Sequence, residues 1–168
     1  IGVGGIGMSA VAMGLLKKGY SVSGSDLVKN DETNKLEKLG AIIFNSQIGQ
    51  NIEFITSKFN NKLINFVVST AIKPENEELM YCREKNLPVK HRSEILALLM
   101  QSYTSLGVAG SHGKTSTSTF LSTLLELCTH NSSSITGGII PIYNSNCHLE
   151  NTKFLVAEVD ESDGTIIR

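Results

Sequence analysis

The stretch GVGGIGMS, residues 2–9, contains the spacing G-x-G-x-x-G at Gly2, Gly4 and Gly7 and leads into a helical pattern over 8–16. Glycines at these positions let the backbone approach a diphosphate, and the unpaired N–H groups of a helix start supply partial positive charge. Asp26 follows the last glycine by about 20 residues, where an acidic side chain can accept hydrogen bonds from a nucleotide. The stretch therefore predicts a phosphate-binding turn, although a tight turn needed only for packing has the same spacing.

Outward from this turn, short apolar runs alternate with helical spacings, which is typical of an α/β fold with a parallel sheet. Pro74 is expected in the first turn of one helix, and Ser93 is expected to cap the next. The polar stretch 45–61 predicts no element. The expected strands cover 20–24, 41–44, 63–69, 87–89, 104–109 and 153–159, and the expected helices cover 8–16, 31–39, 74–85, 94–100 and 114–128.

A second glycine turn, GSHGKTS at 110–116, stands between an expected strand and an expected helix. In such a turn the backbone N–H groups surround phosphates, the Lys114 ammonium approaches the β and γ phosphates, and the Thr115 hydroxyl reaches magnesium. The pattern departs from the usual phosphate loop because Val108 stands at the position of the first glycine. A loop that only caps the helix is the alternative. That helix carries one apolar face, made of Phe120, Leu121, Leu124, Leu125 and Cys128.

The last expected strand ends in an acidic group, EVDESD at 158–163. A phosphate loop needs an acidic partner on a neighbouring strand to complete its magnesium site, so Glu158 or Asp160 is the expected ligand. A solvated acidic turn is the alternative. Because the second loop opens a new strand–loop–helix unit, we expect one domain over 1–102 and a second domain, with the phosphate loop, over 103–168.

The composition of the 168 residues excludes several classes of protein. With 40% apolar and 18% charged residues the chain is not expected to be disordered, and a net charge of -1 attracts neither nucleic acid nor anionic lipid. Three widely spaced cysteines favour reduced thiols over a disulfide or zinc framework. No apolar run is long enough to cross a membrane, so we expect a cytoplasmic protein without nucleic-acid or membrane partners.

In combination, six segments resemble the Mur ligases, ATP-dependent amide-forming enzymes of bacterial cell-wall peptidoglycan synthesis. The resemblance runs through nearly the whole chain, and the ordered set is far more specific than any single motif. Within the family it is strongest to the members that join L-alanine to UDP-N-acetylmuramate. The segments are GVGGIGMS at 2–9, GSD at 24–26, VVSTAI at 67–72, RSEIL at 92–96, AGSHGKTS at 109–116 and AEVDESDG at 157–164.

The resemblance implies a Rossmann-like first domain that holds UDP-N-acetylmuramate and a second domain that binds ATP and Mg²⁺. It also implies that the lactyl carboxylate is phosphorylated to an acyl phosphate, which the amine of alanine then attacks. Lys114 would stabilise the transferring phosphoryl group, while Thr115 and Glu158 would bind magnesium. The UDP-sugar would contact Gly4, Gly5, Ile6, Gly7, Met8, Asp26, Ser69, Thr70, Ala71 and Ile72, and ATP would contact Gly110, Ser111, His112, Gly113, Lys114, Thr115 and Ser116.

The resemblance further implies parts outside this sequence, namely the rest of the ATPase sheet, a magnesium-binding histidine and a C-terminal domain that receives the amino acid. We therefore expect the 168 residues to be a fragment that does not turn over alone. Three other functions stay open: the related ligase that recycles murein tripeptide, a nucleotide-binding module without ligase chemistry, and an NAD-dependent oxidoreductase. The second turn and the acidic strand end argue against the oxidoreductase, because hydride transfer requires neither.

Overall fold

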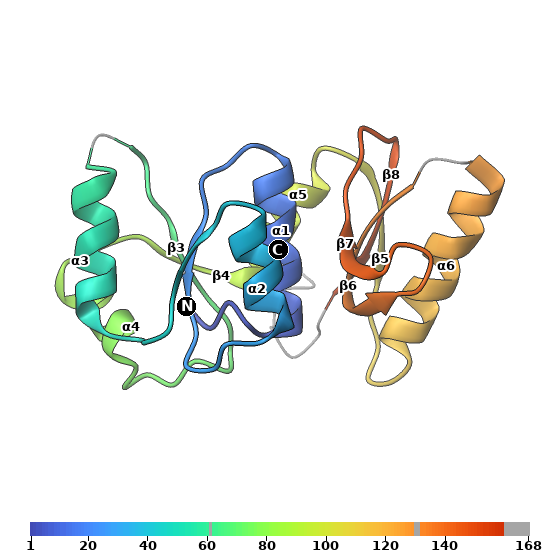
Figure 1. Cartoon of the computed structure of the whole chain (residues 1–168). Coiled ribbons are helices and arrows are strands. Elements are labelled where there is room, and N and C mark those ends of the chain that lie inside the picture. The colour runs from blue at the N-terminus through green and yellow to red at the C-terminus, as the bar shows by residue number, and fades with distance from the viewer. Residues whose placement is uncertain (61, 130–131, 160–168) are drawn as a thin grey trace.

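The computed structural model describes residues 1–60, 62–129 and 132–159, which form two α/β parts side by side (Figure 1). The helices are α1 (Ile6–Lys17), α2 (Asp31–Lys38), α3 (Gly49–Lys58), α4 (Glu77–Glu84), α5 (Arg92–Met100) and α6 (Lys114–Thr129). The strands are β1 (Ser23–Ser25), β2 (Ile42–Phe44), β3 (Phe66–Val68), β4 (Val89–His91), β5 (Thr104–Val108), β6 (Ser132–Ile140), β7 (Ser145–His148) and β8 (Phe154–Glu158). The first part contains α1–α5 with β1–β4, and the second contains β5–β8 with α6.

Two parallel strand pairs, β1–β2 and β3–β4, make up the sheet of the first part. Residues 1–3 link the pairs, because Ile1 N donates to Val67 O at 2.8 Å while Val3 N donates to Ser25 O at 3.0 Å. The resulting order is β2, β1, residues 1–3, β3 and β4, which is the order of a Rossmann-like sheet around its first strand. The glycine turn therefore leaves the middle of this sheet.

The second part is a four-stranded sheet in the order β5-β8-β6-β7. β5, β8 and β6 run parallel, and β7 pairs antiparallel with β6 as the second arm of a hairpin. α6 packs against β6 and β8, whereas α1 contacts β6 and β7. Figure 1 shows α1 between the two sheets and α6 at the outer side of the second sheet. The first helix of one part thus also covers the sheet of the other.

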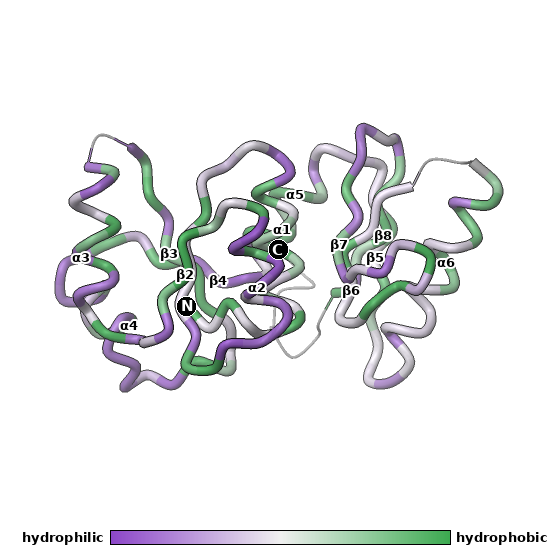
Figure 2. The backbone as a smooth tube through the Cα atoms, in the orientation of Figure 1, coloured by the Kyte–Doolittle hydropathy of each residue, from purple (hydrophilic) through white to green (hydrophobic). Residues whose placement is uncertain are grey.

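One apolar core runs through both parts. On α1 it includes Val11, and it continues through Leu99 of α5 to Ile135 of β6 and Leu155 of β8. Gly14 allows this close packing, because a Cβ there would lie 3.1 Å from Leu99 Cδ1. Figure 2 shows the contrast between the apolar α1 and the polar α2, which lies nearer solvent. This shared core fixes the position of the first glycine turn relative to the second sheet.

Several predicted boundaries are corrected by the structure. α4 begins at Glu77, and the side chain of Asn76 caps it by accepting from Leu79 N at 3.1 Å, so Pro74 lies before the helix. α5 is capped by His91 and not by Ser93, because Glu94 Oε1 accepts from His91 N at 2.9 Å. The strand expected over 63–69 is shorter than predicted. For the two helices, a capping hydrogen bond sets the first residue at a position that apolar spacing does not reveal.

The structure also contains elements that the sequence did not predict. α3 lies within the stretch 45–61, where its buried side consists of Asn51, Ile52 and Ile55. The hairpin of β6 and β7 lies between the expected helix 114–128 and the expected strand 153–159. Its first strand reads SSSITGGII, in which serine and glycine are poor strand formers, so propensity gave no signal.

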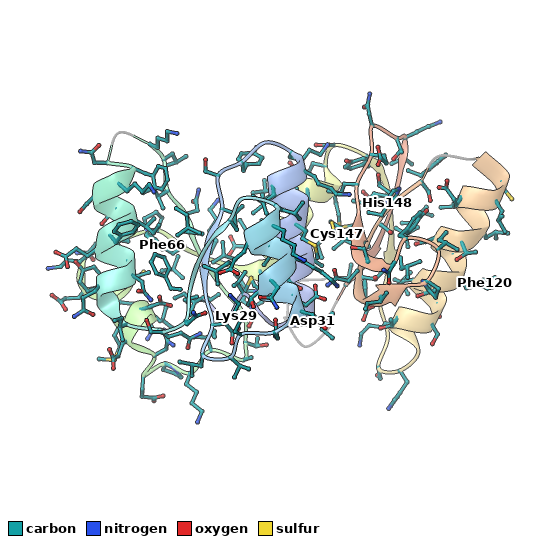
Figure 3. The ribbon with its side chains drawn as sticks, in the orientation of Figure 1. Lys29, Asp31, Phe66, Phe120, Cys147 and His148 are labelled. Atoms are coloured by element: carbon teal, nitrogen blue, oxygen red, sulfur yellow. The ribbon has the colours of Figure 1, made fainter. Side chains whose placement is uncertain are left out.

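The apolar face predicted for α6 is partly exposed. Phe120 is 72% exposed, and Figure 3 shows it on the outer side of α6. Ser118 and Ser122 are instead fully buried, and these small side chains let α6 lie close to the sheet. Among the described residues, no helix has the length and apolar character needed to span a membrane.

Candidate functional site

The first glycine turn is held together by Asp26, which follows β1. Gly4 N donates to Asp26 Oδ2 at 2.8 Å, and Val28 N donates to Asp26 Oδ1 at 3.1 Å. A Cβ at Gly4 would lie 2.8 Å from Asp26 Oδ2, so only glycine permits this approach. Gly2 has a φ of 73°, a left-handed conformation that also favours glycine. Asp26 therefore has a structural role in the turn in addition to the nucleotide contact predicted for it.

Asn30 is a second support of the turn that sequence reasoning missed. Its Nδ2 donates to Gly4 O at 3.0 Å, and its Oδ1 accepts from Thr33 N at 3.0 Å as the cap of α2. One side chain thus fixes both the start of α2 and the glycine turn. The signal was available, because Asn before Asp-Glu-Thr is a common start of a helix.

A pocket of about 690 Å³ opens beside the first glycine turn. It brings together all the residues predicted to contact the UDP-sugar except Gly4, which is buried and does not line the pocket. Arg92 of α5 also lines it, and a Cβ at Gly7 would lie 2.9 Å from Arg92 Nη1. The predicted residues in the lining are Gly5, Ile6, Gly7, Met8, Asp26, Ser69, Thr70, Ala71, Ile72 and Glu158. A guanidinium beside a glycine turn is a favourable arrangement for a diphosphate.

A buried carboxyl group supports the end of β1 next to Asp26. The Ser25 hydroxyl donates to Glu78 Oε2, and Asn51 Nδ2 donates to Glu78 Oε1 at 2.7 Å. Burial raises the pKa of Glu78 above its ordinary value, and the two hydrogen bonds act in the opposite direction. Glu78 is only 1% exposed, and its bond to Ser25 contributes to the position of β1.

The second glycine turn follows β5 and leads into α6. Gly110 and Gly113 have φ values of 145° and 75°, which are accessible mainly to glycine. Lys114 Nζ donates to Gly110 O at 2.8 Å, so the ammonium folds back over the loop. The other predicted ATP contacts, Ser111, His112 and Ser116, are exposed around the same loop. Positive φ at two glycines, exposed loop residues and a following helix start are features of phosphate-binding loops.

Thr115 and Glu158 meet at the end of the second sheet. β5 and β8 are parallel neighbours with Val108 opposite Glu158, and the Thr115 hydroxyl donates to Glu158 Oε2 at 2.9 Å. The same oxygen accepts from Gly137 N at 2.8 Å. The alternative ligand Asp160 and the rest of the acidic segment, 160–163, lie outside the described residues.

This pair is of the kind that binds magnesium. Within 1–60, 62–129 and 132–159 there is no group of three His, Cys, Asp or Glu residues that could hold a metal. Mg²⁺ commonly uses one or two protein oxygens together with phosphate oxygens and water, so a Thr–Glu pair beside a phosphate loop fits it. The two oxygen ligands that fit Mg²⁺ here are the Thr115 hydroxyl and the Glu158 carboxylate.

The two candidate sites are continuous. Glu158 belongs to the Thr115 pair and also lines the pocket of the first glycine turn, together with Thr136 and Gly137 of β6. Asn146 of β7 reinforces the junction, because its Nδ2 donates to Ile6 O at 2.9 Å. No role could be predicted from the sequence for these residues of the hairpin, because the hairpin itself was not predicted. A group bound at the first turn can therefore extend toward the second.

Comparisons with known proteins identify the family and the relatives that this chain resembles. A family model described as "Mur ligase family, catalytic domain" matches residues 1–104. A UDP-N-acetylmuramate–L-alanine ligase of Prochlorococcus marinus subsp. pastoris is 73% identical over 166 residues, which cover 99% of this chain and 35% of that protein. A ligase of the same name from Prochlorococcus marinus strain SARG is 49% identical, and the match covers 100% of this chain and 35% of that protein. The chain thus spans about a third of the length of these relatives.

Solved structures share the fold. A UDP-N-acetylmuramate–alanine ligase from Thermotoga maritima matches with a TM-score of 0.79 and 28% identity, covering 96% of this chain and 36% of that chain. A UDP-N-acetylmuramate:L-alanyl-γ-D-glutamyl-meso-diaminopimelate ligase from Neisseria meningitides matches with a TM-score of 0.86 over 99% of this chain and 53% of that chain. Its 24% identity shows the common fold alone. Since the family model covers more than half of the residues, this chain belongs to the Mur ligase family.

Proposed function

We propose that this chain provides the UDP-sugar site and the phosphate loop of a UDP-N-acetylmuramate–L-alanine ligase. The observation that carries the proposal is the position of Glu158, which bonds to Thr115 and also lines the pocket of the first glycine turn. A ligase that phosphorylates a sugar-linked carboxylate needs its two phosphate-bearing substrates to meet in this way. The proposed division is 1–102 for the UDP-sugar domain and 103–168 for the ATP-binding part, in a cytoplasmic enzyme.

In the UDP-sugar site, the backbone of residues 4–8 would face the diphosphate. The N–H groups at the start of α1 and the guanidinium of Arg92 supply positive charge there. Asp26 would contact the uridine while it holds Gly4, and residues 69–72 would line the opposite side of the pocket. The sugar and its lactyl group would then point toward Glu158.

In the ATP site, the loop 110–116 would surround the phosphates. Lys114 would leave its bond to Gly110 O and stabilise charge on the transferring phosphoryl group. Thr115 and Glu158 would hold Mg²⁺, and this ion, when bound, neutralises charge on the β and γ phosphates. The N-terminus of α6 and the Lys114 ammonium both supply positive charge at this loop.

The proposed reaction has two steps. A lactyl carboxylate oxygen attacks the γ phosphorus of ATP, the bond from that phosphorus to the β–γ bridging oxygen breaks, and an acyl phosphate and ADP form. The amine of L-alanine then attacks the acyl carbon, inorganic phosphate leaves, and the nitrogen loses a proton to give the amide. The residues described here act in the first step by positioning and by electrostatic stabilisation.

The names of the close relatives favour alanine over the murein tripeptide as the amino substrate. The relatives at 73% and 49% identity are both named as L-alanine ligases. The ligase for the longer peptide is similar at 24% identity, a level that supports the fold and not the substrate. A nucleotide-binding module without ligase chemistry is the second candidate, and it would bind both nucleotides without forming the amide.

The experiment uses a full-length ligase that carries this sequence and its Lys114→Ala variant. Loss of the ammonium should reduce the rate of ADP formation by at least about 10³-fold, because a group that stabilises transferring charge contributes on this scale. Calorimetric affinity for UDP-N-acetylmuramate should be unchanged, since Lys114 lies outside the lining of the first pocket. Unchanged turnover in the variant, or tighter binding of NAD than of UDP-N-acetylmuramate by the parent, would contradict the proposal.

A further inference from the structure

Gly137 and Gly138 lie near the end of β6, where the two candidate sites meet. Among the described residues, the glycines with positive φ are Gly2, Gly19, Gly40, Gly110 and Gly113, so the backbone of the β6 pair is accessible to any residue. The reason for glycine at these two positions is therefore space and not conformation. What occupies that space is the side chains of Glu158 and Thr115.

Gly137 contacts the carboxylate of Glu158 through its backbone. Its N–H donates to Glu158 Oε2 at 2.8 Å, and a Cβ at this position would lie 2.8 Å from Oε1 and 3.1 Å from Cδ. The Glu158 carboxylate thus lies directly against the backbone of β6. With Oε2 accepting from both Gly137 and Thr115, the rotation of the carboxylate is fixed.

Gly138 leaves the space that the side chain of Thr115 occupies. A Cβ at Gly138 would lie 2.6 Å from Thr115 Cγ2, a distance that forces one of the two groups to move. The backbone of β6 is itself held here, because the Thr136 hydroxyl donates to Gly138 O at 2.7 Å. An added methyl group would therefore push Thr115, at the first turn of α6, away from the sheet and from Glu158.

We propose that Gly137 and Gly138 are positioning residues that hold Thr115 and Glu158 in the geometry needed for magnesium-dependent ATP binding. The inference rests on the proposed function and adds a third element, β6, to the phosphate loop and the acidic strand end. Groups that orient a metal ligand typically change metal affinity by about 10- to 100-fold when they are altered. If the two glycines served only the close packing of α6 on β6, replacing them would change stability and leave magnesium affinity intact.

The test is Gly138→Ala in the full-length ligase, because Gly138 does not line the UDP-sugar pocket. The Mg²⁺ concentration that half-saturates binding of an ATP analogue, measured by calorimetry, should rise by about 10-fold or more. Affinity for UDP-N-acetylmuramate should stay within about twofold. Gly107→Ala is the matched control in the same sheet, since its Cβ would lie an ordinary 3.4 Å from Val159 Cγ2.

A rescue variant separates the contact from a general packing defect. Thr115→Ser keeps the hydroxyl and removes the Cγ2 methyl that an alanine at 138 would meet, so the double variant Gly138→Ala/Thr115→Ser should regain most of the lost magnesium affinity. A Gly138→Ala variant that behaves like Gly107→Ala, or a double variant that fails to fold or to recover, would overturn the inference. Failure of the parent to bind ATP in a magnesium-dependent manner would instead overturn the proposed function.

Discussion

At the scale of single residues, one of the side chains that hold the first turn, that of Asp26, also faces the pocket. Asp26 accepts hydrogen bonds from Gly4 N and Val28 N while it lines the cavity. Its importance could be predicted from its distance along the chain from the glycines. The contact with Gly4 could not, because it depends on how β1 and the turn meet in space. Arg92 gave even less signal, since one arginine at a helix start has no distinctive spacing.

The cysteines illustrate what burial adds to a residue type. Burial raises the pKa of Cys147 to about 12 and that of Cys82 to about 11. Figure 3 labels Cys147 on β7, and its side chain belongs to the core that α1 shares with the second sheet. Cys128 is exposed on α6. The three thiols therefore differ in access, although the sequence around them gives no indication of it.

We predict that iodoacetamide at pH 8 labels Cys128 in the folded chain and leaves Cys82 and Cys147 unlabelled, as measured by peptide mass spectrometry. The pH dependence follows from the same burial. Above pH 9.0, the ordinary pKa of the thiol, the unfolded chain loses the Cys147 proton while the folded chain keeps it up to about pH 12. The free energy of unfolding should therefore fall across this window, and less so in Cys147→Ala than in Cys128→Ala. Equal slopes in the two variants would show that Cys147 is accessible.

At the scale of elements, long helices with apolar spacing could be predicted, and elements defined by small or polar residues could not. α1 and α6 follow directly after glycine turns, and both turns were recognised from their spacing. β6 was missed because its buried residues Ser132, Ser133 and Ser134 resemble a loop in composition. α3 was missed because its first residue is Gly49 and no side chain caps it.

α2 offers a test of how one cap serves the site. Asn30→Ala removes the bond to Thr33 N and should lower the free energy of unfolding by about 1 kcal/mol. Asn30→Asp keeps an oxygen that can cap the helix but loses the Nδ2 donor to Gly4 O. Urea unfolding should therefore show near-parental stability for Asn30→Asp, while calorimetry shows weaker UDP-N-acetylmuramate binding. Full affinity in Asn30→Asp would exclude a role of this bond in the turn.

At the scale of the whole molecule, the two parts share one apolar core. The domain boundary predicted from the motifs gave no indication of this shared core. The sequence predicted two phosphate-binding turns but not that α1 packs on β6 and β7. That contact depends on Gly14, whose Cβ would lie 3.2 Å from Leu149 Cδ1 and 3.7 Å from Ile135 Cδ1. The apolar spacing of α1 indicates that the helix is buried, but not which sheet it faces.

A larger side chain at Gly14 should therefore strain both parts at once. We expect Gly14→Val to lower the free energy of unfolding in urea by about 1 to 3 kcal/mol, the usual cost of overpacking a core. Ala97→Val on the exposed side of α5 is the control for a β-branched residue in a helix and should cost much less. If the two variants were equally stable, α1 would not be confined between the two sheets.

In the proposed ligase, one pocket joins the sugar-diphosphate turn to the metal end of the phosphate loop. A crystal structure of the full-length ligase with UDP-N-acetylmuramate, Mg²⁺ and a non-hydrolysable ATP analogue would test this directly. We predict density for the diphosphate against residues 4–8, and the lactyl carboxylate between Thr136 and the ion held by Thr115 and Glu158. A UDP-sugar bound outside this pocket, or Glu158 turned away from the ion and the γ phosphate, would contradict the account.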